Sequence, residues 1–287
     1  INYTFLRLQE QAKIKYSPDN TKVCINTGLQ TPEGKDIFAL WENRDKRFYA
    51  TIVYQGVTYF NTVMELNENA QNDYAYGKNV GSKTGYYSRK AIDESLSVTD
   101  CQKSGTDYID IRLAEVMLNY AEAAVEVGKT NEAFDMLKQI RKRAGIEAGA
   151  DGLYGLKVGS REEIRQAILD ERHIELCYEG HRFWDLRRTR NMMMLAGWTK
   201  HGIEAIAVNP DGSDMDLNIA RDRIAKNELT TGDFRYVIHQ VPYTEAAERQ
   251  FVIEESFYFF PIKKTYLDEN PNLEQNNNWG GTFNPTM

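Results

Sequence analysis

Between Tyr108 and Gly145 the apolar residues recur every three or four positions, which is the spacing of one face of an α-helix. Gly128 interrupts this pattern, so it predicts two helices, over residues 108–128 and 130–145. Because the link between them is so short, the two helices are expected to pack antiparallel. The apolar positions are Ile109, Leu113, Val116, Met117, Tyr120, Ala121 and Ala124 in the first helix, and Ala133, Phe134, Leu137 and Ile140 in the second.

This pair resembles one tetratricopeptide unit, which needs neighbouring helices to cover its apolar faces. Residues 161–180 are predicted to supply one of them. Ser160 followed three residues later by Glu163 is a capping box, so a helix is expected to begin there, and Gly180 is expected to end it. Phe183, Trp184 and Leu186 follow as an expected apolar plug over the helical core.

Glu171, Glu175 and Glu179 repeat at four-residue steps on the same predicted helix. Like charges at this spacing weaken a helix by a few tenths of a kcal/mol per pair, so cations are expected beside them. The sequence supplies Arg172, Arg182, Arg187, Arg188 and Arg190, together with Arg141 and Arg143 from the preceding helix. We interpret the stretch as a structural ion-pair network of Glu171, Arg172, Glu175, Glu179, Arg182 and Asp185. The alternative is a catalytic carboxylate pair, Glu171 with Glu175.

Residues 61–90 are rich in Asn, Gly and Tyr and show little periodicity, as expected of a long surface loop. Tyr74 and Tyr76 lie close in sequence to Asn72, which combines flat apolar faces with a polar side chain. A sugar ring needs this combination. Just before the loop, the β-prone runs 51–54 and 57–60 flank Gln55-Gly56 and predict a β-hairpin. Farther on, a helix is expected around residues 219–227 and an extended strand over 251–260.

The 287-residue chain carries a formal net charge of −7, which argues against a nucleic-acid partner. It contains no apolar run of the roughly 18 residues that a membrane-spanning helix needs. Nucleotide-binding loops, GxSxG and HExxH are all absent, and the four histidines lack the spacing of metal ligands. No metal or cofactor is expected, although the sequence leaves open whether Ca²⁺ orders a loop. We therefore expect a binding protein and not an enzyme.

Five segments in a fixed order resemble the SusD/RagB family. They are NRDKRFYATI (43–52), TGYYSRKAID (84–93), DIRLAEVMLNYAEA (110–123) continuing into LKQIRKRAG (137–145), ILDERHIELCYEGHRFWDLRR (168–188) and YFFPIKKTYLDENPNLEQN (258–276). The resemblance implies a mainly α-helical fold with tetratricopeptide-like hairpins, long irregular ligand-binding loops and minor β-hairpins. It also implies that residues 1–287 form one domain, the carboxy-terminal portion of a longer protein.

The family further implies a nutrient-binding lipoprotein exposed on the outer membrane of a Bacteroidetes-type bacterium. Its expected partner is a SusC-like TonB-dependent transporter, and its lipid anchor would lie outside this sequence. The leading hypothesis is glycan binding through Trp41, Tyr74 and Tyr76, with Asn72 as a polar contact. The alternatives are peptide binding in the same transport class, a glycosidase using Glu171 and Glu175, and a helical scaffold that binds only protein.

Overall fold

The structure is a computed structural model, and it groups the chain into two compact units. The first unit comprises Ile1–Tyr178 and Lys200–Val241, and the second comprises Glu179–Thr199 and Pro242–Met287. That residues 1–287 form a single domain stays a prediction. The described residues are 13–16, 22–26, 44–54, 57–60, 62–64, 84–97, 99–198, 201–226, 228–229, 233–240 and 251–285.

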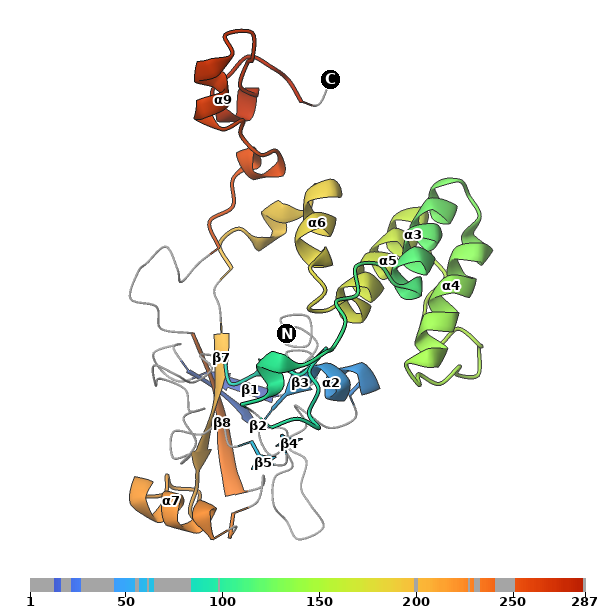
Figure 1. Cartoon of the computed structure of the whole chain (residues 1–287). Helices are drawn as coiled ribbons and strands as arrows, with labels where there is room; N and C mark the ends of the chain where they lie inside the picture. Colours follow the sequence, from blue (N-terminus) through green and yellow to red (C-terminus); the bar gives the residue numbers. More distant parts are fainter. Residues whose placement is uncertain are drawn as a thin grey trace. The chain divides into compact units, whose positions relative to one another are not determined.

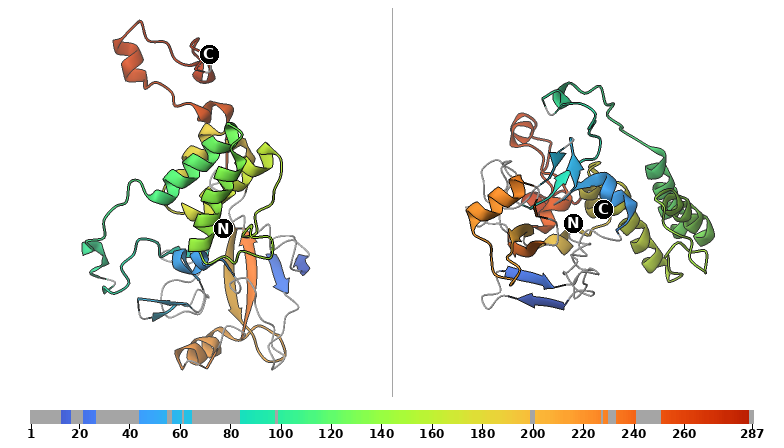
Figure 2. Two further views of the ribbon diagram at one scale, coloured as in Figure 1. Left: turned by 90° about the vertical axis from the view of Figure 1, so that its right-hand side faces the viewer. Right: turned by 90° about the horizontal axis from the view of Figure 1, so that it is seen from below.

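Three helices of the first unit pack side by side: α3 (Leu113–Glu126), α4 (Thr130–Arg143) and α5 (Arg161–Glu175). They form the green and yellow-green layer in Figures 1 and 2. The predicted α3–α4 hairpin is confirmed, since α3 packs against both α4 and α5. Gly128, in the link after α3, has a φ of +76°, which glycine adopts readily. Their shared core contains Leu118, Ala121, Phe134, Leu137, Ile140, Ile164 and Ile168.

The capping box at the start of α5 is confirmed. The backbone N–H of Glu163 donates to the Ser160 hydroxyl over 3.3 Å, and the Ser160 N–H donates to the Glu163 carboxylate over 2.8 Å. The helix ends at Glu175, five residues before the predicted stop at Gly180. Lys90 and Arg112 donate to the Glu175 carbonyl oxygen, over 3.1 and 2.7 Å, and so satisfy a backbone group at the end of the helix.

A four-stranded antiparallel sheet in the first unit was not predicted. Its order is β1 (Lys13–Tyr16), β2 (Lys22–Asn26), β8 (Phe234–Gln240) and β7 (His201–Ala207), as Figure 1 shows. The sequence patterns gave no indication of β1 or β2. The pairing of β2 with β8 joins segments about two hundred residues apart, which local patterns do not reveal.

The predicted hairpin over residues 51–60 is also wrong. Residues 46–51 form helix α2 (Lys46–Thr51), with the Asp45 side chain accepting from the Arg47 N–H at its start. Strand β3 (Ile52–Val53) pairs with β6 (Tyr87–Ser88), and β4 (Thr58–Tyr59) pairs with β5 (Thr62–Val63). The chain therefore turns at Phe60, whose φ is +48°, a value that tight hairpin turns require. Minor β-hairpins are present, in different places from those predicted.

Among the described residues, the first unit also contains a 3-10 turn and a further helix. They are η1 (Cys101–Lys103) and α7 (Leu217–Ala225). Helix α7 confirms the helix expected around residues 219–227.

The second unit is built from short elements around Leu186, Met192 and Tyr258. The strand expected over residues 251–260 is wrong, because a 3-10 turn occupies its middle. The predicted apolar plug is confirmed for one of its three members and wrong for the other two. Leu186 is buried, but 44% of Phe183 and 56% of Trp184 is exposed, and their rings lie around the Arg187 guanidinium. The elements are α6 (His181–Arg188), η2 (Met192–Leu195), η4 (Glu255–Tyr258), α9 (Lys264–Glu269) and η5 (Asn277–Trp279).

Candidate functional site

Two buried carboxylates, Glu171 and Glu175, lie one turn apart on the inner side of α5. Only 1% of Glu171 and 3% of Glu175 is exposed. The Arg47 guanidinium bridges them, with Nη1 2.7 Å from Glu171 Oε1 and 3.0 Å from Glu175 Oε2. Arg47 is itself held by Asp45, whose Oδ1 lies 3.0 Å from its Nε. The ion pairs of Arg47 therefore connect α2 to α5.

Three further arginines, two on α4 and one just before α3, complete the carboxylates' partners. Arg141 of α4 places Nε 2.8 Å from Glu171 Oε2. Arg112, just before α3, places Nη1 2.7 Å from Glu175 Oε1, which also accepts from Arg143. Each of the four carboxylate oxygens therefore accepts at least one guanidinium N–H. We call Asp45, Arg47, Arg112, Arg141, Arg143, Glu171 and Glu175 the inner cluster.

The pKa values within the inner cluster follow from this pairing. Burial alone would raise the pKa of Glu175, but hydrogen bonds from Arg112, Arg47 and Arg143 outweigh it and hold the pKa below its usual value. The pKa of Asp45 is lowered in the same way, by Arg47 against the effect of burial. Burial would lower the pKa of Arg47, but the hydrogen bond to Asp45 and the charge of Glu171 raise it. Glu175 and Asp45 thus stay ionised at neutral pH.

The remaining members of the proposed ion-pair network have other partners. Arg172, buried on α5, donates to Asn119 Oδ1 over 2.6 Å. In the second unit, Asp185 pairs with Arg188 over 2.7 Å, and Arg182 lies 4.0 Å from Met194 Sδ. Glu179 is half-buried in the turn after α5.

Sequence reasoning named Arg141 and Arg143 but missed Arg47, Arg112 and Lys90. Their segments carried part of the family resemblance, so the signal was present. Which helix these cations face could not be derived from it.

The residues predicted to bind ligand, Trp41, Asn72, Tyr74 and Tyr76, all lie outside the described residues. Their role stays a prediction. Within the ranges that the structure describes, no group of three or more His, Cys, Asp or Glu side chains could hold a metal ion. The helices described there are too short or too polar to cross a membrane.

Comparison with known proteins identifies the chain's relatives. The profile of the SusD family matches residues 18–279. A SusD-like protein of Formosa agariphila, named P2, is 35% identical over 97 residues, which cover 33% of this chain and 19% of the relative. The chain thus matches about a fifth of that relative's length.

Solved structures show the same fold. A SusD-like protein of Bacteroides fragilis superimposes with a TM-score of 0.62 at 22% identity, over 94% of this chain and 45% of that one. A SusD-like carbohydrate-binding protein of the same species gives a TM-score of 0.54 at 24% identity, over 88% of this chain and 48% of that one. At these identities the likeness establishes the fold alone.

Proposed function

Because the chain belongs to the SusD family, we propose that it binds glycans at the surface of a Bacteroidetes-type bacterium. It would deliver them to a SusC-like TonB-dependent transporter in the outer membrane, where a lipid anchor would attach it. The family match over residues 18–279 carries the proposal. The carbohydrate-binding relative from Bacteroides fragilis supports it.

The sugar would stack on Trp41, Tyr74 and Tyr76, and Asn72 would hydrogen-bond to its hydroxyls. Tyrosine and tryptophan suit this role because they present a flat apolar face with a polar edge. Three of these residues fall within residues 61–90, whose length and composition are those expected of a binding loop.

In this proposal the inner cluster is structural and not catalytic. A glycosidase needs one carboxylic acid that can donate a proton and one free carboxylate. Glu175 is held ionised, and the oxygens of Glu171 and Glu175 are all occupied by arginines. These contacts favour a binding protein over a glycosidase.

The test is calorimetric titration of the intact protein with a panel of oligosaccharides and mixed peptides. Saturable heat with one glycan class is expected, and the triple variant Trp41→Ala/Tyr74→Ala/Tyr76→Ala should abolish it. The matched control is Tyr108→Ala, since Tyr108 is an 88% exposed tyrosine outside the predicted loop. Binding unchanged in the triple variant would refute the residue assignment. Heat with peptides alone would refute glycan binding.

A further inference from the structure

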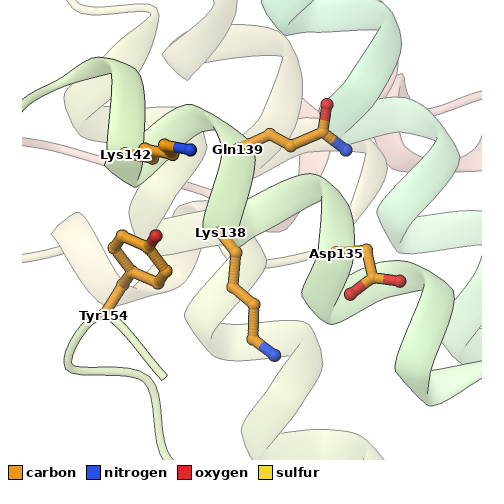
Figure 3. Close-up of a pocket in the computed structure, with 5 residues that line it drawn as sticks. All are labelled: Asp135, Lys138, Gln139, Lys142 and Tyr154. Atoms are coloured by element: carbon orange, nitrogen blue, oxygen red, sulfur yellow. The ribbon is translucent and has the colours of Figure 1, made fainter. Parts of the chain in front are cut away.

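A shallow hollow of about 330 Å³ lies beside α4, and none of the residues that line it belongs to the inner cluster. Figure 3 shows its lining: Lys138 and Asp135 extend from α4 to the same side, and the Tyr154 ring stands near Lys142. Asp135, Lys138, Gln139 and Lys142 follow at helical spacing along one face of α4. Its volume is at the lower end for small-ligand sites.

Tyr154 is held in an unusual backbone conformation beside this hollow. Its φ is +54°, in the left-handed region that residues with a side chain rarely adopt. Its N–H donates to the Ala148 carbonyl oxygen over 2.9 Å, and its carbonyl oxygen accepts from Arg141 Nη1 over 2.9 Å. Such conformations persist only where the surroundings fix them, and they concentrate at functional sites.

Arg141 links the hollow to the inner cluster. One of its nitrogens holds the Tyr154 backbone while another pairs with the buried Glu171. The ring that forms a wall of the hollow is therefore attached, through one arginine, to the most deeply buried carboxylate of the cluster. A wall fixed in this way is preorganised for a ligand.

The two lysines of the hollow differ from the charged groups of the inner cluster in their pairing. Among the described residues, the ammonium groups of Lys138 and Lys142 have no ion-pair partner, and Lys138 is half-buried. One carboxylate, Asp135, stands against these two cations, which leaves an excess of positive charge. Gln139 adds an amide that can both donate and accept hydrogen bonds.

We propose that this hollow binds a sugar unit that carries a carboxylate. The C–H face of the sugar stacks on Tyr154, and the carboxylate lies between Lys138 and Lys142. The Gln139 amide both donates to and accepts from the sugar hydroxyls, whereas the Asp135 carboxylate only accepts from them. The inference rests on the proposed glycan-binding function, but it assigns a site separate from Trp41, Tyr74 and Tyr76.

The test uses trigalacturonate and, as its neutral counterpart, the fully methyl-esterified trimer. In titrations of the intact protein, the acid should bind about tenfold more tightly than the ester, because an ionised group strengthens each hydrogen bond. The double variant Lys138→Gln/Lys142→Gln should remove this difference. The control Lys103→Gln removes one exposed charge outside the hollow and should preserve it.

A second variant tests the stacking surface. Tyr154→Asn removes the ring but keeps a residue that tolerates the left-handed backbone. It should weaken binding of both the acid and the ester.

The outcomes separate the two proposals. If the acid and the ester bind equally, or the lysine variant binds the acid as the unaltered protein does, while other glycans bind, the inference is overturned and the proposed function stands. If no glycan in the panel binds, the proposed function fails and the inference fails with it.

Discussion

The α3–α5 helices carry two clusters of charge that differ in one respect. In the inner cluster the oxygens of Glu171 and Glu175 are all engaged by arginines, and both side chains are almost fully buried. Beside α4, Lys138 and Lys142 line an open hollow with one carboxylate between two ammonium groups. Buried charged groups that are fully paired hold segments together, whereas charged groups that line an open hollow are available to a ligand. The predictions below test this distinction.

The largest effect is expected from removing a carboxylate of the inner cluster. Glu171→Ala leaves Arg141 and part of Arg47 without their partner in a buried setting, which should cost about 3 kcal/mol of stability. Urea denaturation measures the loss. The matched control on the same helix is Glu162→Ala, an exposed residue whose removal should barely move the midpoint. Equal shifts for the two variants would show that the inner cluster is not structural.

The inner cluster should also make the protein sensitive to acid. The pKa of Glu175 is lower in the folded protein than in the unfolded chain, so the unfolded state binds more protons as the pH falls. This contribution to stability is fully present above the unfolded pKa of about 4.3 and is lost as the pH falls through the folded value. Urea midpoints measured from pH 7 to pH 3 should therefore fall less steeply in Glu175→Gln. Parallel curves would contradict the assignment.

A smaller effect on stability is expected from a variant that breaks the connection between the inner cluster and the hollow. Arg141→Lys keeps a cation for Glu171 but loses the second donor, which holds the Tyr154 carbonyl oxygen. The loss of this hydrogen bond should cost about 1 kcal/mol, measured by urea denaturation. Trigalacturonate binding should weaken as well. Stability lost with unchanged affinity would mean that Tyr154 does not depend on Arg141.

The smallest effect on stability is expected in the hollow itself. Lys138→Gln should leave the urea midpoint where it is, because Lys138 has no ion-pair partner among the described residues. The unaltered protein should bind trigalacturonate more weakly as salt rises from 0.05 to about 0.5 M, since exposed charges are screened. Affinity independent of salt would contradict a site built on two lysines.

Local patterns predicted the elements whose stability is local. The spacing of Leu137 and Ile140 marks the buried face of α4, and the Ser160–Glu163 capping box fixes where α5 begins. The hairpin predicted at residues 51–60 was wrong because β3 pairs with Tyr87–Ser88, which lies far from it along the chain. The four-stranded sheet was missed for the same reason, since β2 pairs with β8.

The residues of the candidate sites were likewise predictable only in part. The glutamate repeat on α5 revealed that cations were needed, and Arg141 and Arg143 of the adjacent helix were among those named. Arg47 and Arg112 come from segments with no local signal that they face α5. Tyr154 gave no signal, because periodicity reveals neither its positive φ nor the hydrogen bond that its carbonyl oxygen accepts from Arg141. Contacts between distant segments were beyond what periodicity can reveal.

The most direct test of the distinction between the two clusters is the affinity for trigalacturonate in one variant from each. We predict that Lys138→Gln/Lys142→Gln binds about tenfold more weakly than the unaltered protein, and that folded Glu175→Gln binds within about twofold of it. The reverse pattern, with affinity lost in Glu175→Gln and retained in the lysine variant, would show that the ligand-binding charge lies in the inner cluster and would contradict this account.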